Sequence, residues 1–471
     1  MTRQHDVAIL GAGPAGSTAA TLLAQRGLDV VVLEKDHFPR FHIGESLLPA
    51  SVCIFERLGV NDRIRETSIR KPGGIWLYGP RKVPGDFSIP DSKASFQQHP
   101  YSYLVERSVF DQVLIQRSAE CGADVRFGCE VTDLIQSDGR VTGIRYRDES
   151  GTESEIYARQ IVDATGLRSL VPTKLRLRER TMPHRMGIYA QYSADCMRED
   201  AGKGWFLGQM FYDGWTWLIR LPGNRFSVGV VLSVERFRRS GLSPTQLLER
   251  LVRENELLNN GMSANRERIS DVFVTGQMGN TSTQLAGEGW VAVGDAAYFI
   301  DPCYSSGVHL AMSSGEMVAD VIAELPRSSV IPATAMNDYQ KKMRKHESAV
   351  LCMVDAFYIA SRSTAVQKMV TGLQGGYFSR KFVTFVGGDF RQNSSFIRRF
   401  RIYSKIVSFL FGNDPAVRPE TSPDYLCDNG VPDSTSPPAS GMSEVFIRPP
   451  DGAHQIPIVR PEAAAASGIQ P

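Results

Sequence analysis

The first part of the chain alternates short apolar runs with an amphipathic stretch. Asp6–Leu10 and Leu28–Leu33 are mostly apolar runs of strand length, and Ser17–Arg26 between them has apolar residues at helical spacing. A glycine-rich turn, Gly11–Gly16, joins the first run to the helical stretch. Two buried strands around one helix predict a βαβ unit and therefore an α/β fold with a parallel sheet.

The pattern changes further along the chain. We expect Tyr101–Val131 and Arg159–Gly166 to return to the same sheet, and Gly289–Val293 to add another buried strand. Residues 181–284 contain short, aromatic-rich segments, which predict an antiparallel sheet that covers the substrate. These segments are Gly204–Tyr212, Trp215–Leu221 and Phe226–Val234. Helices are expected from about Ser306 to Leu325 and over most of Asn337–Phe411.

Composition narrows the class of protein. A chain of 471 residues suggests two or three domains, and a net charge of +2 without a basic stripe argues against a nucleic-acid partner. The seven cysteines form no CxxC pair, so neither a metal site nor a disulfide framework is expected, and a reducing cytoplasm fits. No apolar run reaches the roughly 20 residues of a transmembrane helix, so no membrane span is expected.

The glycine-rich turn has the spacing of a dinucleotide-binding site. Gly11 permits the tight turn, Gly13 lets a pyrophosphate approach the backbone, and Gly16 lets the helix pack on the strand. The helix N-terminus then offers amides and a positive dipole end to the phosphates. Glu34 ends the second strand, where a ribose-binding carboxylate belongs. The strand, helix and acid together make a glycine turn without a ligand the weaker interpretation.

Two segments far along the chain from the glycine turn indicate which dinucleotide the site binds. Val162–Gly166 (VDATG) ends a strand in a turn of small residues, and Gly294–Ala297 (GDAA) follows another strand. With the glycine turn, they resemble the FAD-dependent monooxygenase superfamily, which has the fold of p-hydroxybenzoate hydroxylase. The resemblance implies FAD as the cofactor, with Asp295 accepting a hydrogen bond from a ribityl hydroxyl. No second glycine fingerprint marks a nicotinamide domain, so reduced FAD would come from a separate flavin reductase.

Three more segments resemble the flavin-dependent halogenases, in the branch that acts on phenolic, pyrrolic or carrier-protein-tethered substrates. They are Phe38–Pro49, Gly214–Ile219 and Asp301–Leu310. The similarity extends from Asp6 to about Gly412. It implies that reduced FAD, oxygen and chloride or bromide generate hypohalous acid, which halogenates an electron-rich ring.

The resemblance assigns a catalytic lysine and a tryptophan wall. Lys71 matches an essential lysine in a K-x-G context, although a solvated loop lysine is the default for one basic residue among 53. Trp215 and Trp217 would face one side of a strand and shield the flavin, although such pairs also occur in ordinary cores. The family motif is WxWxIP, and Arg220 stands at the proline position.

The remaining assignments surround the flavin ring. Ser306 and Gly307 begin a helix whose unpaired amides would bind the halide, and Val308 would place its amide near the flavin. The resemblance places Glu45 and Ser46 along the isoalloxazine and Arg107 at its edge. Arg107 and Arg40 could equally be surface ion-pair residues. Tryptophan halogenases have a glutamate at the place of Tyr304, which argues against free tryptophan as the substrate.

These patterns predict four parts of the chain. Residues 1–180 and 285–335 form the FAD-binding domain, 181–284 the antiparallel sheet, and 336–415 a helical region. Residues 416–471 form a tail that we expect to be disordered from about 433, because it is rich in Pro, Ser and Ala. An FAD-dependent aromatic monooxygenase, a geranylgeranyl-reductase-like flavoenzyme and a non-catalytic flavoprotein are the alternatives. The substrate, its attachment to a carrier protein and the choice of halide stay open.

Overall fold

The computed structural model describes most of the first 411 residues. These are residues 4–78, 81–88, 90, 93–182, 185–212, 214–276, 278–326, 332–372, 376–390 and 394–411. The predicted tail at 416–471 lies outside the described residues. No helix within the described ranges is long and apolar enough to cross a membrane.

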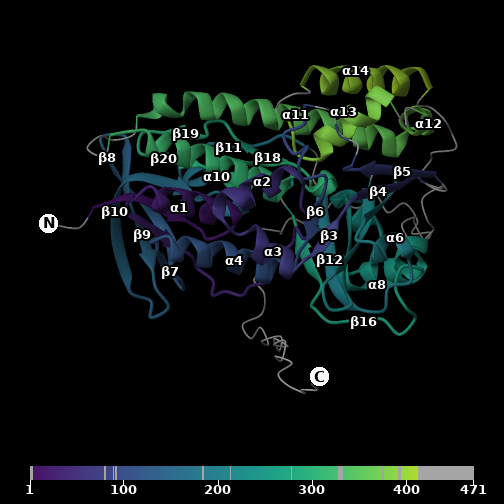
Figure 1. Ribbon diagram of the computed structural model, residues 1–471, viewed down its shortest axis with the longest axis horizontal. Coiled ribbons are helices and arrows are strands. Elements are labelled where there is room, and N and C mark those ends of the chain that lie inside the picture. Colours follow the sequence, from purple (N-terminus) through teal and green to yellow (C-terminus); the bar gives the residue numbers. More distant parts are fainter. Residues whose placement is uncertain are drawn as a thin grey trace, which may run out of the picture. The chain divides into compact units, whose positions relative to one another are not determined.

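A mainly parallel sheet forms the part of the molecule on the left of Figure 1, as the βαβ pattern predicted. In spatial order, its parallel strands are β20 (Trp290–Ala292), β10 (Glu153–Asp163), β1 (Gln4–Leu10), β2 (Val30–Leu33) and β7 (Asp124–Arg126). The antiparallel strands β8 (Glu130–Ser137), β9 (Arg140–Arg147) and β19 (Ala286–Gly287) extend it. Leu10 is in register with both Leu33 and Asp163, so the carboxyl ends of three strands meet at one edge. The glycine turn, Glu34 and the VDATG turn therefore converge there.

The second sheet is larger than predicted. Its order is β16-β12-β15-β14-β13-β4-β5, with β17 also paired to β12. The strands are β4 (Gly73–Tyr78), β5 (Arg81–Asp86), β12 (Arg185–Ser193), β13 (Phe206–Phe211), β14 (Gly214–Leu221), β15 (Arg225–Ser233), β16 (Glu267–Arg268) and β17 (Phe273–Thr275). The sheet is antiparallel except for one pair, and it extends beyond the predicted range of 181–284, because β4 and β5 join from the N-terminal part and β4 runs parallel to β13. A pairing across roughly 130 residues of sequence leaves no local signal.

Both faces of this sheet are buried, and its two core clusters differ. Trp76, Trp215 and Trp217 pack into the cluster that continues to the parallel sheet. Leu218 and the partly buried Ile75 belong to a separate cluster on the opposite face. The alternation along β4 and β14 is that of strands buried on both sides, and it turns the tryptophans toward the first sheet.

Helices cover the sheets and form the C-terminal region. The α-helices are α1 (Pro14–Gln25), α2 (Ala50–Leu58), α3 (Asn61–Glu66), α4 (Arg107–Glu120), α5 (Leu170–Lys174), α6 (Glu199–Gly202), α7 (Val234–Arg239), α8 (Pro244–Glu254), α9 (Glu256–Asn259), α10 (Gly307–Ala323), α11 (Asn337–Arg362), α12 (Thr364–Gly372), α13 (Gly376–Val386) and α14 (Ser394–Phe411). α1 packs between α10 and α4, and α11 packs along α14 in the upper part of Figure 1. The helical prediction for Asn337–Phe411 is confirmed within the described residues.

Short strands and turns complete the frame around the site. β3 (Ile69–Lys71) pairs with β6 (Ser102–Leu104), and β18 (Asn280–Ser282) lies between β11 (Arg178–Arg180) and β21 (Tyr298–Phe299). The 3-10 turns η2 (Gly294–Ala296) and η3 (Pro302–Tyr304) follow β20 and precede α10. The halide-binding segment predicted from the sequence therefore lies in the connection between β21 and α10.

Candidate active site

The glycine turn has room for a ligand at one position only. A Cβ on Gly11 (φ +101°) would lie 2.6 Å from the Ala164 carbonyl oxygen, and one on Gly16 would lie 2.0 Å from the Gly11 carbonyl oxygen. Gly11 and Gly16 are thus required by close backbone packing. At Gly13 a Cβ would approach only the Arg40 guanidinium, at 3.8 Å. This opening, beside a cation and at the N-terminus of α1, fits a pyrophosphate.

Glu34 is held next to this turn. Its buried carboxylate accepts hydrogen bonds from the backbone N–H of Ala12 at 2.8 Å and of Asp36 at 3.0 Å. Each carboxylate oxygen can accept a further hydrogen bond. The carboxylate is therefore oriented by the backbone and can still bind ribose hydroxyls.

Asp163 of the VDATG turn and Asp295 of the GDAA turn differ in their surroundings. Asp163 accepts hydrogen bonds from the Thr165 N–H and hydroxyl, at 3.0 and 2.6 Å, and from the Val171 N–H at 2.6 Å. It therefore organises the turn itself. Asp295 follows β20 in η2, and burial raises its pKa to about 6 although Arg107 and Arg178 favour its carboxylate form. A carboxyl in this position fits a ribityl hydroxyl.

Arg107 is a buried residue at the start of α4, so its interpretation as a surface residue is wrong. Its guanidinium forms two hydrogen bonds with Asp111, at 2.8 and 2.9 Å, and a third with the Ile43 carbonyl at 2.5 Å. Arg40 lies 3.3 Å from the same Asp111 carboxylate. The i, i+4 spacing of Arg107 and Asp111 on a helix is a sequence signal that could have identified this pair.

Gly44 lies where the flavin-side residues meet. A Cβ there would lie 2.8 Å from Arg107 Nη1 and 3.7 Å from Val308 Cγ2, and its φ is +112°. The structure thus brings Arg107, Val308 and the Gly44 loop together, as the sequence predicted for the flavin ring.

Glu45 follows in this loop and is fully buried, with 1% of its surface exposed. Burial is the main reason that its pKa is raised to about 7, although backbone N–H groups and the Ser227 hydroxyl favour the carboxylate. Its Oε1 atom has no hydrogen-bond partner among the described residues. An unpaired buried carboxyl oxygen fits a hydrogen-bonding ligand on this side of the loop.

Lys71 is also buried, with 3% exposed, so the solvated-loop interpretation is wrong. Its ammonium donates hydrogen bonds to the Ser46 hydroxyl at 2.8 Å and to the Leu47 carbonyl at 2.9 Å. Phe87 and Phe206 cover it, with ring centroids 5.2 and 5.9 Å from Nζ. Burial lowers the pKa of Lys71 to about 7, so the neutral amine and the ammonium coexist near neutral pH.

A serine that the sequence analysis missed connects Lys71 to the predicted halide site. The Ser305 hydroxyl donates to the Ser46 hydroxyl at 3.1 Å. Ser305 has a left-handed φ of +55° and directly precedes Ser306 and Gly307. Sequence analysis missed Ser305 because the contact joins residues 259 positions apart.

Hydrogen bonds to Asp301 hold the segment before α10, which is the predicted halide site. Asp301 accepts hydrogen bonds from the Cys303 N–H at 2.9 Å and from the Tyr358 hydroxyl of α11 at 2.7 Å. Ser306 occupies the N-cap position of α10, and a Cβ on Gly307 would meet no atom within 4 Å. The Cβ side of Gly307 is therefore open, and the first amides of α10 have no partner within the helix, which suits an anion.

The tryptophan pair forms a wall facing the first sheet. The ring centroids of Trp215 and Trp217 lie 5.4 Å apart, and Trp76 contacts Trp215 edge-on at the same distance. Arg220 does not bend the strand, because β14 stays in regular register to Leu221 and Arg220 Nη1 donates to the Gly202 carbonyl at 3.0 Å. The departure from the motif leaves the wall intact.

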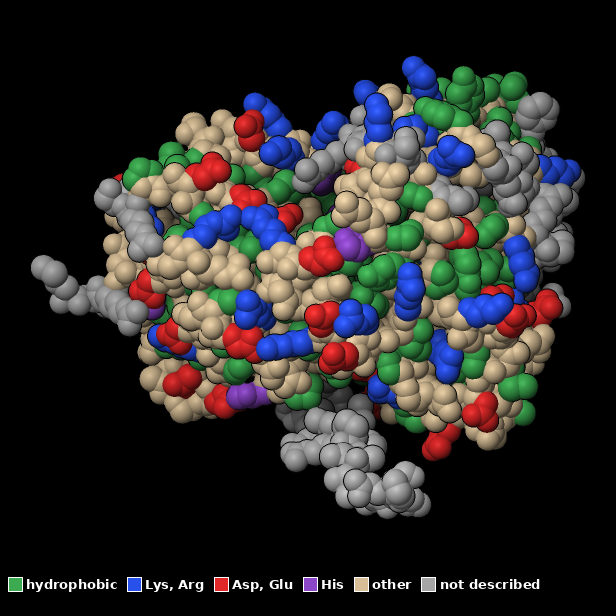
Figure 2. All heavy atoms as spheres, viewed as in Figure 1, with side chains coloured by type: hydrophobic (Ala, Val, Ile, Leu, Met, Phe, Trp, Pro, Cys, Tyr) green, Lys and Arg blue, Asp and Glu red, His purple; other side chains and the backbone are tan. Residues whose placement is uncertain are grey.

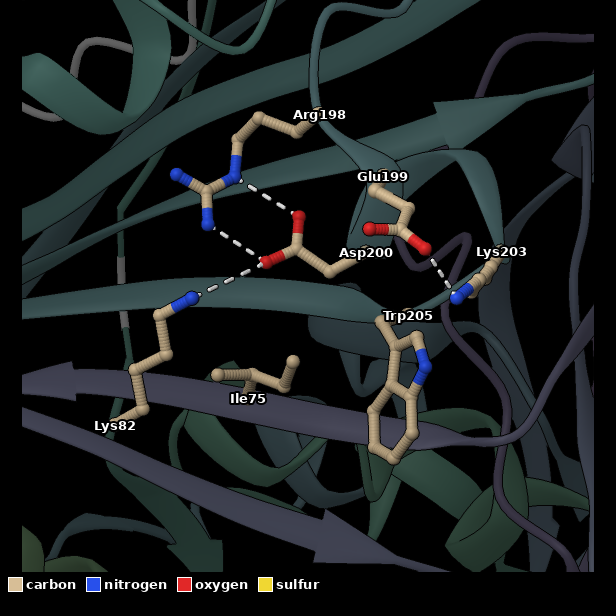
Figure 3. A pocket seen from close by; sticks show the side chains of 7 residues that line it. All are labelled: Ile75, Lys82, Arg198, Glu199, Asp200, Lys203 and Trp205. Carbon is tan, nitrogen blue, oxygen red and sulfur yellow. Dashed lines mark hydrogen bonds and ion pairs between the residues drawn. The ribbon is translucent and has the colours of Figure 1, made fainter.

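A pocket of about 480 Å³ lies away from these residues (Figure 3). It is lined by Ile75, Lys82, Arg198, Glu199, Asp200, Lys203 and Trp205. Arg198 and Lys82 form ion pairs with Asp200, and Lys203 pairs with Glu199. Ile75 and Trp76 point to opposite faces of β4, so the pocket lies behind the tryptophan wall.

Comparisons with known proteins agree with this arrangement. The FAD binding domain family matches residues 4–353. A tryptophan 2-halogenase of Chondromyces crocatus is 31% identical over 369 residues, covering 75% of this chain and 67% of its own length. A 1H-pyrrole-2-carbonyl peptidyl-carrier-protein chlorinase of Pseudomonas fluorescens is 28% identical over 371 residues, covering 74% and 80%.

A solved structure extends the similarity to three dimensions. The myxobacterial chondrochloren halogenase CndH superposes with a TM-score of 0.69 at 27% identity, covering 86% of this chain and 97% of its own. The predictions of an FAD-binding α/β fold and an oxidoreductase activity are thereby confirmed. The protein is an FAD-dependent enzyme that belongs to the flavin-dependent halogenases.

Proposed function

We propose that this enzyme halogenates an electron-rich aromatic ring with hypohalous acid that Lys71 holds and directs. The observation that carries the proposal is a pair of hydrogen bonds to the Ser46 hydroxyl. The buried ammonium of Lys71 donates one of them, and the hydroxyl of Ser305, beside the halide turn, donates the other. One continuous hydrogen-bonded path thus joins the site that binds the halide to the group that guides the oxidised halogen.

Each predicted site residue has a part in this proposal. The adenosine diphosphate part of FAD is held by Gly11, Gly13, Gly16 and Glu34, and its ribityl chain by Asp295. The flavin ring is bordered by Glu45, Ser46, Arg107 and Val308, and shielded by Trp215 and Trp217. Ser306 and Gly307 bind the halide. The open cradle at Gly13 and the unpaired Glu45 oxygen support the fit of FAD.

When bound, reduced FAD would supply, together with O2, the oxidant that converts chloride or bromide into hypohalous acid. Both oxygen atoms of O2 end as water, and the ring exchanges a C–H bond for a carbon–halogen bond. The chain contributes position: α10 amides hold the halide, the indoles keep the organic substrate away from the flavin, and Lys71 Nζ hydrogen-bonds the oxidised halogen. Trapping it as a haloamine is the alternative use of the same nitrogen.

The finer assignments concern the partners. We propose a separate flavin reductase as the source of reduced FAD, and a phenol or pyrrole as the substrate, free or tethered to a carrier protein. The pyrrole-carrier-protein chlorinase among the relatives supports the tethered form. Backbone amides suit chloride and bromide alike. The division at 1–180 with 285–335, the helical region at 336–415, and a cytoplasmic location stay predictions.

The test is a halogenation assay with an added flavin reductase, screening free and carrier-bound phenols and pyrroles by product mass. Lys71→Ala should abolish halogen incorporation while FAD still binds. Lys82→Ala is the matched control, because Lys82 lies on β5 with an exposed side chain. Retained halogenation in Lys71→Ala would contradict the role of Lys71, and oxygen gain without halogen in the native enzyme would support hydroxylation instead.

A further inference from the structure

The two indoles of the wall differ in their hydrogen bonding. Trp217 Nε1 donates to the Ser227 hydroxyl at 3.1 Å. Trp215 Nε1 is buried and has no hydrogen-bond partner among the described residues, and only 2% of Trp215 is exposed. The same side chain, two residues along the same strand, is thus satisfied in one case and unsatisfied in the other.

An unsatisfied buried donor is unfavourable. Folding removes the water that was hydrogen-bonded to the N–H group, and no protein acceptor replaces it. Unsatisfied buried donors of this kind are rare in native proteins and usually have an explanation. A bound molecule that places an acceptor at this N–H removes the penalty. Binding of that molecule is then favoured over binding of one that places a second donor there.

Trp215 belongs to an aromatic cluster that reaches both reacting parts of the site. It contacts Trp76, which contacts Phe206 at 5.5 Å, and the Phe206 ring covers Lys71. Trp215 and Trp76 both contact Phe357, at 6.5 and 4.9 Å, and Phe357 contacts Tyr304 at 5.7 Å. Tyr304 directly precedes Ser305, at the start of the halide turn. The aromatic cluster around Trp215 therefore links Lys71 to the halide turn.

We propose that Trp215 Nε1–H is a specificity-determining donor that binds an oxygen acceptor on the substrate ring. An indole N–H can donate but cannot accept, so it selects a ring with a phenolic oxygen over a ring whose nitrogen donates but has no free lone pair, such as an unsubstituted pyrrole. The inference rests on the proposed function, since it assigns the substrate class for the same site.

The direct test follows the two indole N–H groups by NMR in protein labelled with 15N-tryptophan. Trp215→Phe and Trp217→Phe each remove one signal and so assign both. On titration with 3-methylphenol, the Trp215 signal is expected to shift downfield while the Trp217 signal stays. The control ligand 2-methylpyrrole, whose N–H donates but whose nitrogen cannot accept, should produce no downfield shift. An unchanged Trp215 signal with the phenol, or equal shifts with both ligands, overturns the inference.

A second test compares the variants without ligand. Both substitutions remove the same ring volume, but only Trp217→Phe breaks an existing hydrogen bond. Trp217→Phe is therefore expected to lower the melting temperature by about 1–2 °C more than Trp215→Phe. An equal or larger loss in Trp215→Phe contradicts the inference, because the N–H would then have a partner in the free protein.

Kinetics separate this inference from the proposed function. Trp215→Phe should lower the ratio of kcat/KM for phenols over pyrroles by about tenfold, whereas Trp217→Phe should leave that ratio unchanged. An unchanged ratio in Trp215→Phe, with halogenated products still formed, overturns the inference alone. Absence of halogen from every product of the native enzyme overturns the proposed function, whatever the NMR result.

Discussion

Burial changes the chemistry of three ionisable side chains in the site. It lowers the pKa of Lys71 to about 7 and raises those of Glu45 and Asp295 to about 7 and 6. Groups that are fixed in charge when exposed thereby titrate near neutral pH. The charge state of the site is therefore sensitive to pH near neutrality.

Lys71 should leave a signature in the pH dependence of stability. Its pKa is about 7 in the folded chain and 10.5 as the reference for the unfolded chain, so the unfolded state binds an extra proton between these values. The contribution of Lys71 to the free energy of unfolding is therefore unfavourable at and below pH 7 and improves as pH rises. Lys71→Met removes this slope, which is at most about 1.4 kcal/mol per pH unit.

Denaturant unfolding at pH 7, 8 and 9 measures this slope. The stability of Lys71→Met minus that of the native protein should fall as pH rises. A constant offset from the lost bond to the Leu47 carbonyl does not affect the slope. Lys82→Met is the matched control, because it removes a lysine charge at an exposed position. A flat difference for Lys71→Met would show that the lysine keeps its ordinary pKa.

Elements whose signals are local could be predicted, and those that depend on distant pairing could not. The βαβ unit, the helix at Gly307–Ala323 and the strands at 206–233 follow from periodicity and glycine spacing. β4 and β5 were missed as members of the second sheet, because β4, to which β5 pairs, joins the sheet through β13, which is far away in sequence. The burial of Lys71 and its path through Ser46 to Ser305 depend on the same long-range contacts.

The beginning of α10 offers a test of the halide site. Gly307→Ala adds a methyl group where the structure has no atom within 4 Å, and alanine favours helix more than glycine does. We expect unchanged or slightly higher stability and normal FAD binding. The methyl group would border the first amides of α10, so the KM for chloride and bromide should rise about tenfold.

The matched control is Gly276→Ala, because a Cβ there also meets no atom within 4 Å and Gly276 lies in the loop after β17. Halide dependence of initial rates, measured with both variants at saturating organic substrate, separates the outcomes. An unchanged KM for halide in Gly307→Ala would argue that the anion binds elsewhere.

Across the whole described chain, the exposed large apolar residues are concentrated on one helix. α14 packs on α11 through its inner face, while Ile402, Tyr403, Ile406, Phe409 and Leu410 of its outer face are exposed. Figure 2 shows hydrophobic and cationic side chains together at the top, over α14. Contiguous exposed apolar surface of this kind promotes association, whereas single exposed apolar residues are normal.

Substitution on this outer face should therefore change how the protein behaves with concentration. Phe409, with 87% of its surface exposed, and Leu410 make few contacts that stabilise the fold. Phe409→Ser with Leu410→Ser should keep the melting temperature and reduce the rise of apparent mass with concentration in light scattering. Met197→Ser with Ile269→Ser removes two exposed but isolated apolar side chains, and should leave the concentration dependence as it is. Equal effects of the two pairs would show that total exposed apolar area, rather than its continuity on α14, governs association.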